Sequence, residues 1–263
     1  MSSCVELLDA AQPEQHVVQL YGSDDWLLTR NVARYLSEGL RRGDGLLVIG
    51  TPEHRTTVTH LLREEPGYSM AVLEGRLVFL DAQRTLARFI VDGLPNADLF
   101  REVVGGALER VRSRAVHTRV RAYGEMVGLL WKEGQYDAAL SLEELWNDLL
   151  KQSDVSLFCA YPIDIFSPEF EQGKVDALLC AHTHLLPVDS ALEGALGRAM
   201  DDVLGPRRDH ILDSSQTKHR PSWGAISRSE ALVLWLRNNL PASADQILAR
   251  AREYYHSAAA SHV

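Results

Sequence analysis

Along the first 187 residues, short apolar runs alternate with amphipathic stretches. The apolar runs predict five buried strands, over residues 16–21 (HVVQLY), 46–49 (LLVI), 77–80 (LVFL), 116–123 and 155–161 (VSLFCAY). Between and after them, apolar residues at three- and four-residue spacing predict helices over residues 26–42, 56–65, 82–92, 96–114, 136–152 and 171–181. Strands that alternate with helices of this length are typical of right-handed βαβ crossovers. The pattern therefore predicts a three-layer α/β domain around a mostly parallel sheet.

The pattern changes after Pro187. Residues 191–204, 227–239 and 242–256 have helical periodicity, and the polar stretch 205–224 reads as a loop or linker. We therefore expect one domain over residues 1–187 and a C-terminal helical appendage over residues 188–263.

Composition and charge narrow the class of protein. The chain is 46% hydrophobic and 24% charged, as in ordinary globular proteins, and its net charge of −9 lies entirely within residues 1–187. A negative surface repels phosphate backbones, so we expect no direct nucleic-acid binding. The three cysteines form no CxxC pair, which argues against a disulfide framework. The first fifteen residues do not read as a signal peptide, and no apolar run approaches the ~20 residues that span a bilayer. We therefore expect a cytoplasmic protein that does not bind membranes.

The loop after the first predicted strand has the outline of a phosphate-binding loop without its working residues. Ligands of open parallel sheets bind beyond the carboxyl ends of the strands, which is where GSDDWLLT lies. Gly22 and Thr29 match the ends of the GxxxxGK[ST] pattern, but Leu28 stands at the Lys position. Asp24 and Asp25 add negative charge where phosphates would bind. ATP and Mg²⁺ are therefore disfavoured as cofactors, and from the two matching residues alone coincidence is the favoured explanation.

Several segments together resemble a known sensory family. They are HVVQLYGSDD, LDAQRTLARFIVDGLPN, RAYGEMVGLLW, LEELWNDL, LFCAYPIDIF and CAHTHLLP, in this order over roughly residues 14–187. They resemble the MEDS domain, named for methanogens, methylotrophs and the dichloromethane-responsive repressor. The unit TRNVARYLSEGLRRGDGLLVIGTPE also resembles the helix and strand that follow the P-loop in KaiC-like members of the RecA ATPase family. The resemblance implies a ligand-sensing derivative of the RecA/KaiC-like fold with a degenerate P-loop.

The resemblance also implies a signalling partner. Such domains are usually attached to helix-turn-helix modules or to histidine kinases. About fifteen residues precede the resemblance, and the 76 residues of 188–263 are too few for a kinase core. We therefore expect signalling through a homodimer or through a separate protein such as a histidine kinase or a transcription regulator.

The candidate ligand-binding residues follow the predicted strands. They are Tyr21, Gly22, Ser23, Asp24, Asp25, Thr29, Glu53, Tyr123, Gly124, Glu125, Trp131 and Tyr161. Tyr21 ends the first strand and His16 begins it; the odd separation puts them on opposite faces, so we expect His16 to be a structural hydrogen-bonding residue. Glu125 follows the fourth strand, near the metal-associated Asp of RecA-like ATPases, and Glu53 stands where that family has its catalytic glutamate. The alternative for Glu125 is a surface position. For Glu53, a carboxylate that stabilises the first turn of a helix is favoured over a catalytic role.

The remaining candidates are apolar or small. Trp131 and Tyr161 would line an apolar pocket, and Gly124 would permit close approach of the backbone to a ligand. Cys180, His182 and His184 invite a metal hypothesis, but no further ligand at metal-site spacing is visible, so a turn that closes the domain is favoured. The arginines at positions 110, 112, 114, 119 and 121 predict a solvated face or a dimer-facing stripe.

The leading functional hypothesis is a non-enzymatic sensory protein that binds a small molecule above the sheet. One alternative is a residual KaiC-like ATPase, which the missing Lys disfavours. Another is an interaction scaffold whose crevice is filled by its own side chains.

Overall fold

The structure is a computed structural model that describes most of the chain, namely residues 4–22, 25–187, 190–208 and 228–260. Most of the predicted linker over residues 205–224 lies outside these residues. The chain forms two compact units, Met1–Pro162 and Ile163–Val263. This division falls earlier than the change of sequence pattern, and the domain boundary at Pro187 stays a prediction.

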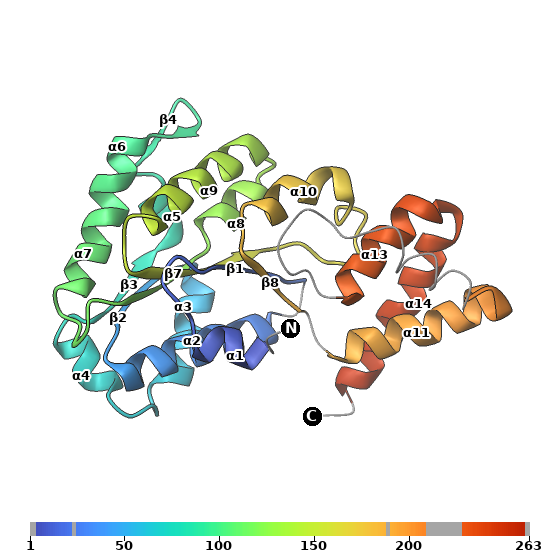
Figure 1. The fold of residues 1–263 in the computed structure, drawn as a ribbon, viewed down its shortest axis with the longest axis horizontal. Helices are drawn as coiled ribbons and strands as arrows, with labels where there is room; N and C mark the ends of the chain where they lie inside the picture. Colours follow the sequence, from blue (N-terminus) through green and yellow to red (C-terminus); the bar gives the residue numbers. More distant parts are fainter. Residues whose placement is uncertain (1–3, 23–24, 188–189, 209–227, 261–263) are drawn as a thin grey trace. The chain divides into compact units, whose positions relative to one another are not determined.

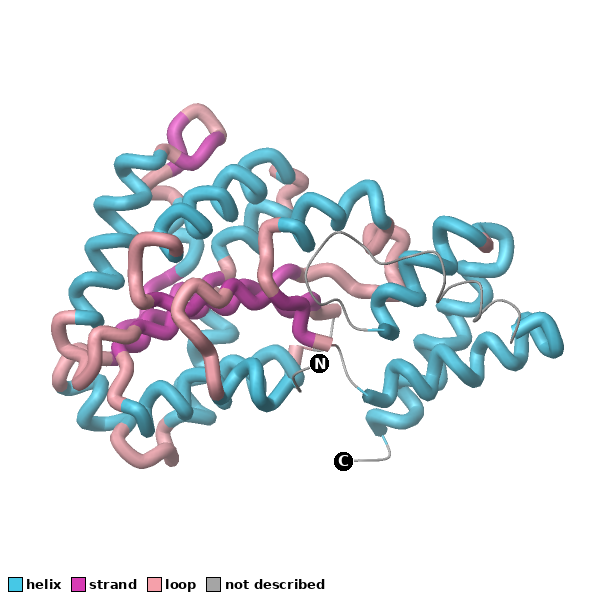
Figure 2. The backbone as a smooth tube through the Cα atoms, viewed as in Figure 1, coloured by secondary structure: helices cyan, strands magenta, loops and turns pink. Residues whose placement is uncertain are grey.

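A parallel sheet forms the centre of the first unit. Its strands are β1 (His16–Leu20), β2 (Gly45–Gly50), β3 (Leu77–Asp81), β6 (Val120–Gly124) and β7 (Val155–Tyr161). Among the described residues of this unit they lie in the order β3-β2-β6-β7-β1, and each pair of neighbours is parallel. Figure 2 shows the strands, in magenta, as one layer with helices above and below it. Every residue of β1, β2, β6 and β7 is buried, because helices cover both faces of the sheet. The predicted α/β class with a mostly parallel sheet is confirmed.

The two faces of the sheet carry different helices. The helices are α2 (Trp26–Arg42) and α3 (Pro52–Leu62) on one face, and α8 (Met126–Lys132) and α9 (Tyr136–Leu150) on the other (Figure 1). Tyr35 of α2 packs edge-to-face on Phe158 of β7, with 5.8 Å between ring centroids. The next residue of that strand, Cys159, faces Glu143 of α9 instead. Successive side chains of a strand point to opposite faces, which explains why neighbouring residues of β7 meet different helices.

Helix α3 begins four residues before the predicted start at Thr56. Thr51 is its N-cap, and the Thr51 side chain accepts a hydrogen bond from the backbone nitrogen of His54. Pro52 follows at the first helical position, where its missing N–H costs nothing. This earlier start places His54 inside the first turn of the helix.

The region over residues 82–114 departs most from its predicted helices. It contains α5 (Ala82–Leu86), a hairpin of β4 (Ile90–Val91) and β5 (Leu94–Pro95), α6 (Ala97–Phe100), the π-helix η1 (Arg101–Gly105) and α7 (Gly106–Arg112). Asp92 and Gly93 form the hairpin turn, with φ of 52° and 82°. An Asp-Gly pair with positive φ at both residues favours such a turn over a helix. The short helices α1 (Cys4–Asp9), α4 (Tyr68–Leu73) and α8 are also absent from the predicted pattern.

Arg121 corrects the expectation that the arginines of this region form a solvated face. Arg110, Arg114 and Arg119 are exposed, but Arg121 is buried in β6 and forms a 3.0 Å ion pair with Asp44. Its guanidinium also donates to the backbone oxygens of Leu8, Asp9 and Tyr35. A strand residue that points inward can be buried if its charge is paired and its donors are satisfied.

The second unit is mainly helical. Its elements are α10 (Gln172–Cys180), β8 (His184–Leu186), α11 (Ser190–Leu204), the 3₁₀ turn η2 (Gly205–Arg207), α13 (Arg228–Asn239) and α14 (Pro241–Ala260). Helices α11 and α14 pack against each other, and Leu196 and Met200 of α11 and Ile247 and Ala251 of α14 are buried. Helices are thus present where the sequence predicts them after Pro187. In the described part of the chain, no helix has the length and apolar character needed to cross a bilayer.

Candidate functional site

A cluster of polar side chains lies at the carboxyl ends of β1, β2 and β6. We call it the His54 cluster; its members are Tyr21, Asp25, His54, Tyr123 and Glu125. The two ring nitrogens of His54 contact two carboxylates: Nε2 is 2.8 Å from Asp25 Oδ2, and Nδ1 contacts Glu125 Oε1. The ring of Tyr21 packs edge-on against the imidazole of His54, with 5.6 Å between centroids. Tyr21, Asp25, Tyr123 and Glu125 are among the residues predicted from the sequence. The structure brings them together around His54, which the sequence analysis does not predict.

Glu125 is the buried anchor of the cluster. Only 2% of this residue is exposed. Its Oε2 accepts from the backbone nitrogen of Thr51 at 2.5 Å, and its Oε1 accepts from the hydroxyl of Tyr123 at 2.5 Å, in addition to the contact with His54. The alternative of a surface Glu125 is therefore wrong. The carboxylate also lies at the N-terminus of α3, where the helix dipole favours negative charge.

The carboxylates set the charge of His54. Burial lowers the pKa of this imidazole, but the hydrogen bond and charge of Glu125, followed by those of Asp25, outweigh burial and raise the pKa to about 9. His54 is therefore a cation at neutral pH. Burial, and next the charge of Glu125, raises the pKa of the hydroxyls of Tyr21 and Tyr123, so both phenols stay protonated. With two carboxylates and one imidazolium, the cluster carries one net negative charge.

The P-loop-like residues hold no exposed phosphate-binding groups among those the structure describes. Thr29 is buried, and its hydroxyl donates to the backbone oxygen of Trp26 at 3.0 Å, so this hydroxyl is satisfied within its own helix. Leu28, at the Lys position, is buried in the core. Gly22 is half-buried, while Ser23 and Asp24 lie outside the described residues.

Four other predicted residues lie apart from the His54 cluster. Glu53 is exposed in the first turn of α3, which agrees with its interpretation as a carboxylate that stabilises the start of a helix. Gly124 pairs with Cys159 in the sheet, and a Cβ on it would lie 3.8 Å from Trp146 of α9. Trp131 and Tyr161 pack edge-to-face at 5.5 Å on the α9 side. Their role as ligand contacts stays a prediction.

A second polar cluster lies between the sheet and α9. We call it the His16 cluster; its members are His16, Glu143, Asn147, Cys159 and Tyr161. His16 Nε2 is 3.3 Å from both Cys159 Sγ and Glu143 Oε2, and its Nδ1 is 2.9 Å from Asn147 Oδ1. The hydroxyl of Tyr161 donates to Glu143 Oε1 at 2.5 Å. His16 thus forms hydrogen bonds within the core, as predicted, and does so in a different cluster from Tyr21.

Two sequence features point to His54 and Glu143, which the sequence analysis does not include among the candidate site residues. Thr51 and Pro52 form an N-cap and first-turn pair that would have started α3 early enough to include His54. Glu143 falls at helical spacing from the apolar residues Ala139, Trp146 and Leu150 of α9. A carboxylate on the buried face of a helix is a stronger sign of a site than one on the solvated face.

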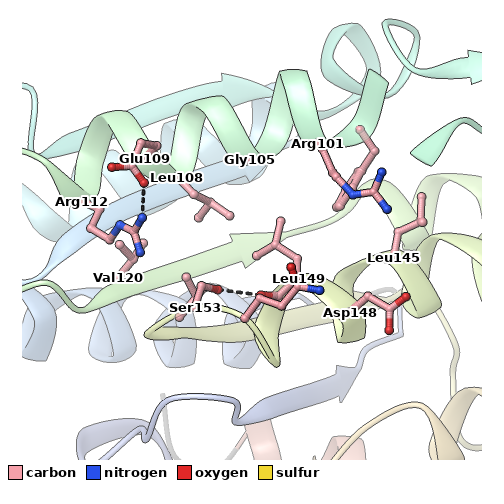
Figure 3. A pocket seen from close by; sticks show the side chains of 13 residues that line it. Arg101, Gly105, Leu108, Glu109, Arg112, Val120, Leu145, Asp148, Leu149 and Ser153 are labelled. Carbon is pink, nitrogen blue, oxygen red and sulfur yellow. Dashed lines mark hydrogen bonds and ion pairs between the residues drawn. The ribbon is translucent and has the colours of Figure 1, made fainter. Parts of the chain in front are cut away.

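The described residues of the first unit line a cavity and an open groove, among other hollows. One cavity of about 200 Å³ lies between α7 and α9, close to the amino ends of β6 and β7, and is lined by Arg101, Glu109, Arg112 and Asp148 among others (Figure 3). It is smaller than the roughly 300 Å³ at which ligand pockets begin. It also lies at the opposite ends of the strands from the His54 cluster. A wider, open groove of about 760 Å³ follows α3 from Pro52 to Arg63, next to the cap that positions His54.

The comparison with protein families agrees with the resemblance of the sequence segments. The family model for MEDS, the methanogen/methylotroph DcmR sensory domain, matches residues 15–183, which is more than half of the chain. The searches of curated proteins and of solved structures found no significant match. The matched region contains every residue of the His54 cluster and of the His16 cluster. The chain therefore belongs to the MEDS family of sensory domains.

Proposed function

We propose that the chain is a non-enzymatic sensory protein whose small ligand binds at the His54 cluster. The observation that carries the proposal is the charged triad of Asp25, His54 and Glu125 at the carboxyl edge of the sheet. Open parallel sheets bind their ligands at this edge. Membership of a sensory family supports the regulatory role.

The charges of the cluster favour a particular class of ligand. One net negative charge disfavours phosphates and other anions, and the Tyr21 hydroxyl and the His54 Nε2–H that faces Asp25 suit a small neutral molecule with hydrogen-bonding atoms. Asp25 is the partner that such a ligand would displace, because its side chain is 50% exposed whereas that of Glu125 is buried. Displacement would release the residue that precedes α2, and a ligand that does so shifts the protein between two states. We propose that this shift reaches the helices after Pro187 or a dimer surface, and from there a histidine kinase or a transcription regulator.

The proposal includes an origin in a RecA/KaiC-like ATPase. The segments that such an enzyme would use follow β1, β2 and β6; Asp25 and Glu125 lie in the loops after β1 and β6, and His54 lies in the first turn of the helix after β2. Leu28 in place of the Lys and the internal hydrogen bond of Thr29 support loss of nucleotide binding. Calorimetric titration of the full chain with ATP and Mg²⁺ tests this: we expect no binding, and tight binding that Thr29→Ala abolishes would contradict a sensor without nucleotide.

Native mass spectrometry of the protein purified from its own host can detect the ligand as a retained small molecule. We expect a retained small molecule that is lost in His54→Asn and kept in His60→Asn. His60 is the matched control, because it lies on the same helix but is exposed and outside the cluster. A molecule retained equally by both variants would place the ligand elsewhere. A wild-type protein that retains no molecule would favour the interaction scaffold.

A further inference from the structure

The His16 cluster brings three different metal-binding atoms to one point in the core. They are the imidazole nitrogen Nε2 of His16, the sulfur of Cys159 and the oxygen Oε2 of Glu143, and they lie within 4.8 Å of one another. The side chains of His16 and Glu143 are 1% and 0% exposed, and Cys159 is fully buried. A charged residue is seldom buried this deeply unless it is paired or binds a metal.

Two of the three separations between these atoms match the edges of a coordination tetrahedron, and the third is slightly longer. Zinc binds imidazole nitrogen, carboxylate oxygen and thiolate sulfur at about 2.0–2.3 Å, which with tetrahedral angles separates the donor atoms by roughly 3.3–3.6 Å. The observed separations are 3.3 Å for nitrogen to sulfur, 3.3 Å for nitrogen to oxygen and 4.0 Å for sulfur to oxygen. Small side-chain shifts would place all three atoms at bonding distance from one ion.

The surrounding hydrogen bonds hold two of the three groups in the orientation that a metal requires. The amide oxygen of Asn147 can only accept, so His16 Nδ1 carries the hydrogen, and in a neutral ring Nε2 then presents its lone pair. Tyr161 occupies Glu143 Oε1 and leaves Oε2 directed at the other two donors. Partners of this kind, which orient a ligand through its second atom, are usual around metal ions in proteins.

The contact of His16 Nε2 with Glu143 Oε2 at 3.3 Å places two possible metal donors side by side. With a neutral imidazole both atoms are acceptors, whereas an imidazolium would donate to the carboxylate. A divalent cation would resolve this contact, and with one thiolate and one carboxylate it would make a buried site with no net charge.

We propose that His16, Glu143 and Cys159 form a binding site for Zn²⁺. A thiolate and an imidazole together favour Zn²⁺ over the hard cations Mg²⁺ and Ca²⁺, which prefer oxygen ligands. The site goes beyond the proposed function: it lies on the other face of the sheet from the groove along α3 and does not depend on the His54 cluster.

X-ray absorption at the zinc edge tests the site without any substitution. The full chain, produced with Zn²⁺ and exchanged into metal-free buffer, should hold about one zinc per chain. We expect one sulfur ligand at about 2.3 Å and nitrogen or oxygen ligands at about 2.0–2.2 Å. A chain that retains no zinc, or zinc with only nitrogen and oxygen ligands, would overturn the proposal and leave His16 as a hydrogen-bonded imidazolium.

Cobalt substitution then assigns the sulfur. The Co²⁺-loaded chain should show thiolate-to-cobalt charge-transfer absorption, which Cys159→Ala should remove. The matched control is the double variant Cys4→Ala/Cys180→Ala, which keeps Cys159 as the only thiol and should keep the absorption. Loss of the absorption in the double variant, or its survival in Cys159→Ala, would contradict the assignment.

Tyr161 is a positioning residue in this site, and its substitution tests the hydrogen bond to Glu143. We expect Tyr161→Phe to weaken zinc binding roughly 10- to 100-fold while the charge-transfer absorption of the cobalt form stays at the same wavelength. An unchanged affinity would contradict the positioning role.

Discussion

The two clusters pair a histidine with a buried glutamate, but they differ in where the chain places them. His54 and Glu125 lie just beyond the ends of β2 and β6, and a half-exposed carboxylate, Asp25, completes their cluster. His16 and Cys159 lie within β1 and β7, and no side chain of the three proposed zinc ligands is more than 1% exposed. The first cluster can exchange a partner with a molecule from solution. The second is fixed by the sheet and suits an ion acquired during folding.

The comparison separates two uses of the same residue types. Loops at the ends of strands tolerate movement and carry binding residues. Strand residues are held by the ladder of backbone hydrogen bonds, so they keep donor atoms at fixed separations. A histidine near a glutamate therefore does not by itself indicate a function. Whether the pair lies within strands or beyond their ends decides whether it can hold a fixed ion or exchange a partner.

The largest expected effect is the loss of Glu125. Glu125→Ala leaves the half-buried Thr51 amide, the Tyr123 hydroxyl and the His54 imidazole without their acceptor. Removing one partner of a buried ion pair costs about 3–5 kcal/mol. Urea denaturation followed by far-UV circular dichroism should show this decrease in the free energy of unfolding.

Glu53→Ala is the control for that substitution. Glu53 is exposed on the first turn of α3, so its loss should cost no more than about 1 kcal/mol, mainly through the helix dipole. Equal effects of the two substitutions would show that Glu125 is not the anchor of its cluster.

The next effect is a pH dependence that belongs to His54. Its pKa is raised to about 9 in the folded chain, from about 6.5 when unfolded. The folded state therefore binds the proton more tightly, so the stabilisation is complete below pH ~6.5 and is lost as the pH rises through about 9. Because solvent screens the partly exposed Asp25, we expect about 1–2 kcal/mol rather than the full value of the shift.

The pH dependence is measured as a difference between two chains. The free energy of unfolding of wild type minus that of His54→Gln should decrease between pH 6.5 and pH 10. Taking this difference cancels tyrosines, lysines and cysteines that titrate in both chains. A difference that is constant, or that grows with pH, would contradict a raised pKa.

Much of the fold follows from periodicity, and the exceptions have local causes. The helix over residues 26–42 has the predicted bounds because Gly43, with φ of 75°, ends it in a left-handed conformation. The hairpin around Asp92 and Gly93 was missed because its strands have two residues each, too few to show alternation. The charge of Arg121 predicted exposure, but three backbone oxygens and Asp44 satisfy it inside the core, and no local pattern carries that information.

The candidate site was predictable in position but not in its contacts. Fold class places Tyr21, Asp25 and Glu125 at the carboxyl ends of strands and so at one edge of the sheet. It does not reveal that Tyr161 points to the other face, because that depends on the register of β7. The approach of Glu143 to Cys159 depends on the packing of α9 over two strands, which sequence spacing cannot specify.

The smallest expected effect tests whether Asp25 is the weaker of the two carboxylates. Asp25→Asn keeps an oxygen that can accept from His54 Nε2 but removes a charge whose side chain is 50% exposed. An exposed ion pair is worth about 0–1 kcal/mol, so stability should change little. In an NMR titration the pKa of His54 should fall but stay above 6.5, because Glu125 remains, while Glu125→Gln should lower it further. The exposed imidazole of His60 serves as the reference in the same spectra. If Asp25→Asn lowers the pKa as far as Glu125→Gln does, the half-exposed carboxylate is not the replaceable partner, and a ligand that displaces Asp25 would have to overcome the same cost as one that displaces Glu125.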